Sequence, residues 1–357
     1  MKLSCVIGIA AAAAMLSGCG GTQSQLAPSG PFQQTSAQSR LGQLSEGLVN
    51  TAMSGAARGG LVALHPDHGR SWMTPGAAAK DLLYISNYYA YDVLVYSYPE
   101  DKLVGTLTGF HAPEGLCVDK KGDVWIVNNA GTDSGEDIIE YKHGGKTPIG
   151  KLEIGNGNAI TCSIDKTTGD LAVNDLVTVS FGQGYVSIFA KAKGAPKTYT
   201  PPNMSNPYFC GYDDKGNLYV DGTQSGVSTE FILAERPKGK SFKDITLKGG
   251  SINFPGNIRW DGKYLLIGDQ EAGSEHDTSV IYQTTGAGGK IVGSIPLTGS
   301  GDILGYWIEG NTVIGPDFEN ANANNVYFYK YPAGGKAIKT LKGFDGPAFA
   351  AVSVAPK

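Results

Sequence analysis

The chain has 357 residues, of which 41% are hydrophobic and only 17% charged, against a usual charged share of about 25%. This composition excludes a charged disordered protein and a coiled coil, whereas 51 Gly and 18 Tyr residues favour a folded all-β protein with many tight turns. The net charge of −4 gives no electrostatic basis for binding nucleic acid, so we expect no nucleic-acid partner.

Residues 1–18 have the pattern of a secretory signal peptide. The apolar run Cys5–Leu16 is too short for a spanning helix, which needs about 20 residues. Leu16-Ser17-Gly18-Cys19 resembles the lipobox of bacterial lipoproteins, and this resemblance implies cleavage before Cys19 and acylation of that residue. Three lipid chains would anchor the protein stably. By the same resemblance, Gly20 at the next position implies that the protein is anchored in the outer membrane, facing the periplasm or the cell exterior. The alternative to a lipoprotein is an ordinary signal peptide with a Cys nearby.

The next segments lead from this anchor to the folded part. Residues 19–60 are rich in Gly, Ser, Gln, Ala and Thr and have few large apolar side chains, so we expect a flexible tether. Residues 61–80 contain His65, His68 and Trp72, and we expect them to pack on the folded domain as an irregular arm.

From Asp81 onward a strand pattern recurs about every 46 residues. Each repeat opens with a short apolar strand ending in Asn or Asp, continues with a second strand, and closes with a strand that leads into a turn containing Asp or Gly. Four short strands per period without helical periodicity are typical of a propeller blade. The opening strands are Asp81–Asn87, Asp123–Asn129, Asp170–Asp175, Asn217–Asp221, Lys263–Asp269 and Asn311–Asp317.

These repeats predict an all-β, six-bladed β-propeller over residues 81–357, with four antiparallel strands per blade. The last strand, Ala348–Val354, is of the innermost type, so we expect it to join the first blade and close the ring. An additional strand before the closing one is recognisable in four of the repeats, at Leu103–Thr108, Ile149–Ile154, Ile291–Pro296 and Ala337–Lys342.

The junction between the first and second repeats resembles the NHL family of propeller repeats. Its Pro113-Glu114-Gly115 strand leads into the turn Asp119-Lys120-Lys121-Gly122, and Phe254-Pro255-Gly256 and Gly346-Pro347 preserve the Pro-Gly pairing. The resemblance implies a propeller, which we expect to be monomeric, but it does not identify a chemistry.

Polar residues at the start of the predicted inner strands would surround one mouth of a central channel. Their mixture of Glu, Asn and Asp is similar to the calcium site of gluconolactonase-like and paraoxonase-like six-bladed enzymes, which polarise a lactone or ester carbonyl with the metal. The resemblance implies Ca²⁺ as a cofactor and a hydrolase as an alternative function. The candidate ligands are Glu114, Asn158, Asn206, Asn257 and Asp302, with Asp345 at the equivalent place in the last repeat.

His111 lies close to Glu114 in the sequence and is the best candidate for acid–base work, with Glu114 as the second candidate. A solvated turn histidine is the simpler interpretation. A streptogramin-lyase-like propeller enzyme would need a His–Glu–His arrangement that is not visible in the sequence, and motifs of serine hydrolases, nucleotide-binding proteins and zinc proteases are absent.

Three cysteines, Cys117, Cys162 and Cys210, fall in the repeat region. Cys162 and Cys210 occupy equivalent places on adjacent inner strands, and Cys117 is displaced by one residue. Because we expect neighbouring inner strands to diverge beyond the Cα separation of about 7 Å that a disulfide tolerates, we predict free buried thiols. A Cys162–Cys210 disulfide is the alternative.

The asparagines and aspartates that end the opening strands recur in every repeat, which favours a scaffold role in bonding the backbone of the following turn. Without a convergent catalytic motif, the sequence predicts a lipid-anchored propeller that binds a protein, peptide or carbohydrate ligand. A calcium-dependent lactonase or esterase is the alternative.

Overall fold

The computed structural model describes residues 69–129, 136–155, 157–176, 183–225, 228–272, 278–318 and 324–356, without the side chains of residues 225, 228 and 229. In this part of the chain the regular structure is β-strand apart from three single 3₁₀ turns, η1 (Ala77–Ala79), η2 (Ala190–Ala192) and η3 (Gly286–Gly288). No described helix is long and apolar enough to cross a membrane. The predicted signal peptide, Cys19, the tether, His65 and His68 lie outside the described residues.

Three sheets each contain four consecutive antiparallel strands. The first comprises β5 (Pro113–Val118), β6 (Val124–Asn128), β7 (Glu136–Tyr141) and β8 (Pro148–Gly155). The second comprises β9 (Ala159–Ile164), β10 (Leu171–Asp175), β11 (Tyr185–Phe189) and β12 (Lys197–Tyr199). The third comprises β13 (Asn206–Tyr212), β14 (Leu218–Ser225), β15 (Ser228–Arg236) and β16 (Lys243–Ile245).

An eight-stranded sheet follows, made of two antiparallel halves that are joined by a short parallel pairing of β20 with β24 at Leu297–Gly335 and Thr298–Lys336. One half comprises β17 (Pro255–Trp260), β18 (Leu265–Asp269), β19 (Val280–Thr284) and β20 (Ile291–Thr298). The other comprises β21 (Trp307–Glu309), β22 (Thr312–Asp317), β23 (Asn325–Lys330) and β24 (Gly334–Lys342).

The remaining sheet combines both ends of the described chain. Its strand order is β1-β4-β3-β2-β25, so the C-terminal strand pairs with β2, as in Leu83 with Val352. Residues 69–80, predicted as an irregular arm, contribute the short outer strand β1 against β4. The strands of this sheet are β1 (Trp72–Met73), β2 (Asp81–Asn87), β3 (Asp92–Tyr98), β4 (Leu103–Leu107) and β25 (Pro347–Ser353).

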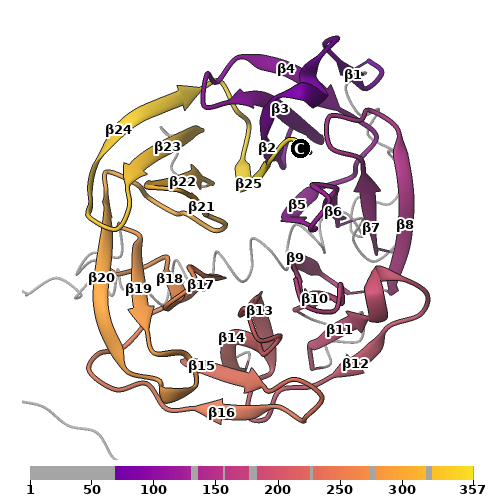
Figure 1. Cartoon of the computed structure of the whole chain (residues 1–357). Coiled ribbons are helices and arrows are strands. Elements are labelled where there is room, and N and C mark those ends of the chain that lie inside the picture. Colours follow the sequence, from indigo (N-terminus) through magenta and orange to yellow (C-terminus); the bar gives the residue numbers. More distant parts are fainter. Residues whose placement is uncertain are drawn as a thin grey trace, which may run out of the picture.

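Figure 1 shows the sheets arranged around a common axis, with β25, β5, β9, β13, β17 and β21 innermost and β4, β8, β12, β16, β20 and β24 at the rim. This is a propeller-like all-β arrangement. Its opening strands follow the predicted repeat closely, and β2 has the predicted bounds.

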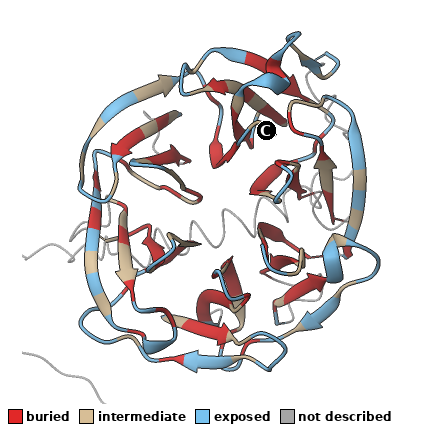
Figure 2. Ribbon diagram, viewed as in Figure 1, coloured by how far each residue is buried: buried red, intermediate tan, exposed pale blue. Residues whose placement is uncertain are grey.

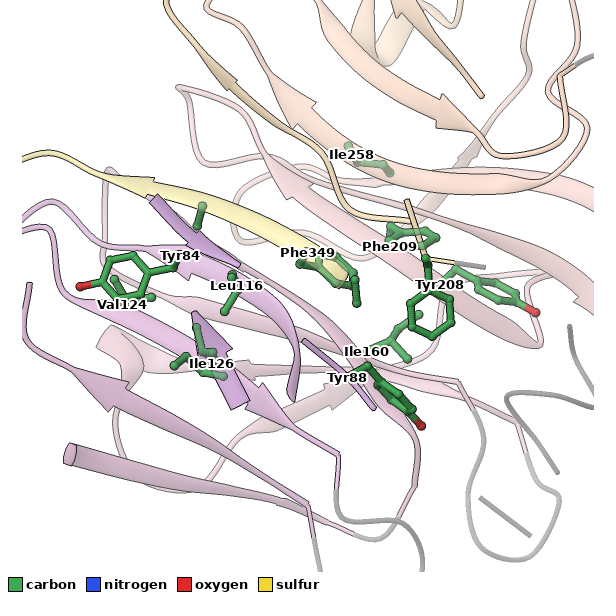
Figure 3. Packing of buried hydrophobic residues seen from close by; sticks show 14 of the residues in the cluster. Tyr84, Tyr88, Leu116, Val124, Ile126, Ile160, Tyr208, Phe209, Ile258 and Phe349 are labelled. Atoms are coloured by element: carbon green, nitrogen blue, oxygen red, sulfur yellow. The ribbon is translucent and has the colours of Figure 1, made fainter. Parts of the chain in front are cut away.

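The inner strands are largely buried and most rim strands are more exposed (Figure 2). Apolar side chains between neighbouring sheets form most of the core. Trp125 and Val127 of β6, for example, pack with Leu171 and Val173 of β10 across the gap between two sheets. The largest cluster includes the inner strands, where Phe209 and Phe349 meet near the axis (Figure 3). Each sheet therefore buries its faces only by stacking on its neighbours, which explains why the sequence repeats.

Recurring Asp residues fix the turns and loops of the repeat. In the turn after β5, Oδ1 of Asp119 accepts hydrogen bonds from the N–H groups of Lys121 and Asp123 at 2.8 and 2.9 Å, and Gly122 adopts φ +84°. At the other end of the sheets, Asp175 and Asp317 accept backbone N–H groups. These N–H groups belong to the loop before the inner strand. Asp269 bonds that loop through Phe254 and also accepts the N–H of Glu271 just after its own strand, as predicted.

The cysteine pairing differs from the prediction, because Cys117 is bonded to Cys162 and Cys210 is a buried free thiol. The Cα atoms of the bonded pair are 5.8 Å apart, since β5 and β9 do not diverge here: a Cβ on Gly115 would lie 2.6 Å from Cα of Thr161. Side chains alternate between the two faces of a strand, so the one-residue displacement of Cys117 turns it toward Cys162. Cys210 instead contacts the carbonyl of Ala172 in β10.

Candidate functional site

Aromatic side chains line a small cavity between the inner strands, near the axis of the predicted channel. The cavity measures about 20 Å³, room for about one water molecule. Tyr208 and Phe209 of β13 and Phe349 of β25 converge on this region from different sheets (Figure 3). Glu114 and Asp302, both predicted to lie at the channel mouth, line this cavity together with Gln270.

Glu114 lies on β5 and is only 3% exposed. Its Oε1 atom accepts a hydrogen bond from Nδ2 of Asn129 at 3.1 Å, and the same amide contacts Oδ1 of Asn158. Burial raises the pKa of Glu114 to about 8, although the bond from Asn129 acts in the opposite direction. Glu114 is therefore mainly a neutral acid at pH 7.

A second buried carboxyl, Glu136 at the start of β7, lies beside this group and was not singled out in the sequence. Its Oε1 accepts the N–H of Ala159 at 2.9 Å, and its Oε2 has no hydrogen-bond partner among the described residues. Burial and then the neighbouring Asp175 raise the pKa of Glu136. Asp175 accepts the N–H of Asn158 at 2.8 Å, so one polar network connects β5–β8 with β9–β12.

The amides of two predicted ligands, Asn206 and Asn257, are bonded to neighbouring segments of the chain. Nδ2 of Asn206 donates to Oγ1 of Thr223 at 3.4 Å, and Nδ2 of Asn257 donates to the carbonyl of Tyr306 at 2.9 Å. Of the five predicted ligands, Glu114 and Asp302 line the cavity, together with Gln270 and mostly apolar or aromatic residues. Ca²⁺ takes about six to eight oxygen ligands, so Glu114 and Asp302 would need several further oxygens to hold this ion.

The other candidate groups lie apart from this cavity. His111 is exposed, and its backbone N–H donates to Oδ1 of Asn128 at 2.8 Å, whereas Glu114 is buried. Among the described residues, the group of three acidic side chains whose ligand atoms lie within 4.8 Å of one another is Asp119, Asp123 and Glu140. This cluster is near the Asp119 turn and had not been predicted as a site.

A second cavity, at the rim, measures about 890 Å³. It is an open groove between β15–β16 and the segment that leads from β16 to β17, and we call it the rim groove. Its lining residues are Glu230, Phe231, Ile232, Leu233, Asp244, Ile245, Thr246, Leu247, Gly250, Ser251, Ile252 and Asn253. The sequence carried one signal of it, because no outer strand was recognisable in the third and fourth repeats.

Comparisons with known proteins support the fold alone. No protein-family model matches the chain, and no curated protein matches it. A chain in a crystal structure of a nidogen/laminin complex, a β-propeller-containing protein, is similar with a TM-score of 0.58 and 12% identity, covering 78% of this chain and 100% of that chain. A protein of unknown function from Bacteroides caccae is similar with a TM-score of 0.56 and 12% identity, covering 77% and 99%.

Proposed function

We propose that this chain is a membrane-anchored, extracytoplasmic β-propeller that serves as a ligand-binding or protein-interaction scaffold. The observation that carries the proposal is the contrast between the small cavity near the axis and the rim groove. The channel has a cavity of about 20 Å³, whereas ligand sites usually measure about 300–1,000 Å³. The rim groove, at about 890 Å³, falls within that range and is lined by no catalytic constellation.

The scaffold in this proposal is a six-bladed propeller of NHL type, closed by the C-terminal strand. The pairing of β25 with β2 supports closure, and so does a polar contact in which His143 Nδ1 lies 2.6 Å from Oγ of Ser353 and Nε2 lies 2.9 Å from the carbonyl of Lys80. The halves β17–β20 and β21–β24 of the eight-stranded sheet then count as two blades.

Anchoring through acylated Cys19 rests on the lipobox-like sequence. The test is metabolic labelling of cells with a palmitate analogue, followed by separation of inner and outer membranes. Wild-type protein should incorporate label and fractionate with the outer membrane, and Cys19→Ala should do neither. Equal labelling of both proteins would contradict the anchor without affecting the scaffold.

Photo-crosslinking in whole cells tests the binding role. A photoreactive amino acid replaces exposed residues at separate places: Tyr89 near the channel, Ile338 on β24 and Glu230 in the rim groove. A scaffold should give a discrete adduct from at least one position. Absence of adducts from all positions in the folded, correctly localised protein would contradict the proposal.

A calcium-dependent lactonase or esterase is the second candidate, and the observation that favours it is the buried acid Glu114 beside Asp302. The small cavity and its few oxygen ligands weigh against it. Calcium titration by calorimetry with a panel of lactones separates the two functions. Tight binding together with turnover that Glu114→Gln abolishes would favour the hydrolase.

A further inference from the structure

Strand β15 is much longer than the strand that covers it. It has nine residues, Ser228–Arg236, and pairs with β14 along most of that length. The outer strand β16 pairs only with Leu233, Ala234 and Glu235. The β15–β16 ladder therefore ends before Ile232 and Phe231, whose outer edge borders the rim groove.

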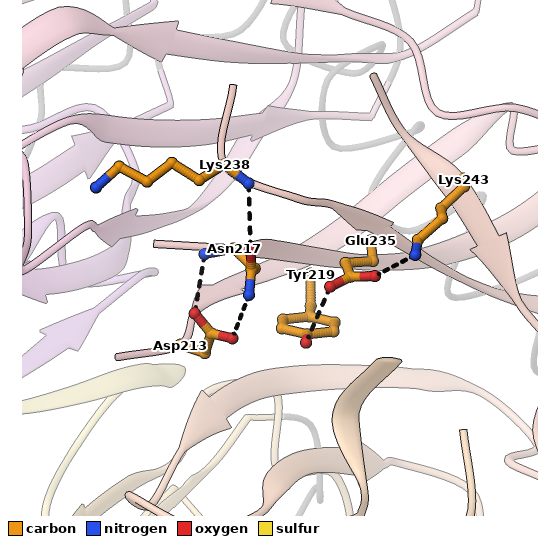
Figure 4. A network of polar contacts seen from close by, with 6 residues as sticks. All are labelled: Asp213, Asn217, Tyr219, Glu235, Lys238 and Lys243. Carbon is orange, nitrogen blue, oxygen red and sulfur yellow. Dashed lines mark hydrogen bonds and ion pairs between the residues drawn. The ribbon is translucent and has the colours of Figure 1, made fainter. Parts of the chain in front are cut away.

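The covered end of β15 is held firmly. Glu235 accepts the hydroxyl of Tyr219 at 3.3 Å and forms an ion pair with Lys243 of β16 at 3.0 Å (Figure 4). Beyond Ile245 the chain leaves the ladder and crosses to the next sheet, where Lys248 forms a bridge with Lys290. This departure opens the rim groove next to a fixed strand.

The floor of the rim groove is apolar. Leu233, Ile245 and Ile252 are buried in the largest core cluster, and the partly buried Phe231 and Leu247 pack against it. A side chain entering the groove from an added strand can therefore contact the partly buried Phe231 and Leu247, which rest on this core. In an antiparallel ladder, one of two successive residues directs its N–H and C=O away from the strand already paired. Either Phe231 or Ile232 thus offers its backbone groups to the groove.

The charged residues that line the rim groove are acidic. Asp244 is exposed on β16 and accepts Nδ2 of Asn203 at 2.7 Å, and Glu230 is exposed on β15. The lining includes no Lys or Arg. An occupant is accordingly favoured if it carries positive charge at its ends and apolar side chains between them.

We propose that the rim groove binds an extended peptide segment with alternating apolar residues and a flanking Lys or Arg, which adds a strand to the outer edge of β15. This inference deepens the proposed binding function and rests on it. The guest strand continues the ladder where β16 leaves it, directs apolar side chains toward Phe231 and Leu247, and places its basic residue near Asp244. Main-chain hydrogen bonds supply affinity. The apolar residues and the acidic side chains of the groove select the sequence of the peptide.

The test begins with selection of a displayed library of random nonapeptides against the purified full-length chain. Binding of the selected peptides is then measured by calorimetry with wild type, with Asp244→Lys in the groove, and with Glu153→Lys as a control. Glu153 is an exposed acid on β8, the outer strand of another sheet. Thermal unfolding of each variant establishes that it is folded.

We expect selection of basic peptides with alternating apolar residues, at least tenfold weaker binding to Asp244→Lys, and unchanged binding to Glu153→Lys. N-methylation at one alternate set of peptide nitrogens should abolish binding, and at the other set should leave it intact, because only one set faces β15. Selection of acidic peptides, no selection, or indifference to Asp244→Lys and to N-methylation would overturn the proposal. Crosslinks from other positions in cells would still support the scaffold if the groove fails.

Discussion

The sheets β5–β8 and β13–β16 have the same strand order but different outer edges. In the first, the eight-residue β8 pairs with β7 from Glu136 to Tyr141. In the second, β16 has three residues against nine in β15. The inner strands of both sheets must stack on their neighbours, whereas an outer strand can shorten without opening the core. Differences between the sheets of this fold are therefore expected mainly in the outer strands at the rim.

The largest expected loss of stability comes from a substitution on an inner strand. Phe209 on β13 is 1% exposed and meets Phe349 and Tyr208, so Phe209→Ala should lower the free energy of unfolding by about 3–5 kcal/mol. Phe231→Ala, in the rim groove, removes the same group from a partly buried place and should cost much less. Urea unfolding measures both variants, and equal losses would contradict the contrast between axis and rim.

Loss of the disulfide should have the second largest effect on stability, because it joins β5 to β9 across a separation of 45 residues. Reduction should lower the stability by about 3–4 kcal/mol. The double variant Cys117→Ser, Cys162→Ser should be insensitive to reductant, while Cys210→Ala should keep the full sensitivity. If Cys210→Ala removed the sensitivity, the pairing would be wrong.

The acids between β5–β8 and β9–β12 should give a pH-dependent effect. The pKa of Glu114 is raised from 4.5 to about 8, so the folded chain binds the proton more tightly and stability from this group falls as pH rises from about 4.5 to about 8. Glu114→Gln should melt near the wild-type temperature at pH 5 and above it at pH 9. Melting curves of both proteins across this pH range measure the difference in melting temperature. A Glu114→Gln variant that melted below the wild type at pH 9 would contradict the prediction.

The smallest expected effect on stability comes from two similar ion pairs, each of which joins the third strand of a sheet to the fourth. Lys151 of β8 lies 2.6 Å from Asp137, and Lys243 of β16 lies 3.0 Å from Glu235. Exposed lysines contribute about 0.2–1 kcal/mol. Lys151→Met should leave β8 protected from hydrogen exchange, whereas Lys243→Met should loosen the three-residue β16. Equal exchange of the two outer strands in their variants would show that ladder length is irrelevant.

Much of the fold could be predicted because each repeat must satisfy the same packing. The strand Asp81–Asn87 and the turn from Asp119 to Gly122 carry local signals, namely apolar runs and side chains that cap turns. The pairing of Cys117 with Cys162 was missed because it depends on how closely β5 and β9 approach, which Gly115 permits. The one-residue displacement of Cys117 relative to Cys162, which places the two side chains on opposite faces of their strands, was the signal available in the sequence.

The candidate site was predicted only in part. Glu114 and Asp302 were placed at the channel, and both line its cavity. The aromatic lining of this cavity by residues such as Phe349 depends on side chains from several sheets, and the sequence does not reveal how far each reaches. The rim groove could not be predicted in detail, because it arises where β16 is too short to show a strand pattern.

Residue-resolved amide exchange at Phe231 and Ile232 tests the uncovered edge most directly. Without peptide, one of these two amides should exchange at nearly the solvent rate while its neighbour is slow, and on β7 both Ile138 and Ile139 should be slow, because that strand is covered on both sides. A selected basic peptide should then protect the fast amide. Slow exchange at both positions in the peptide-free protein would show that the edge of β15 is already occupied.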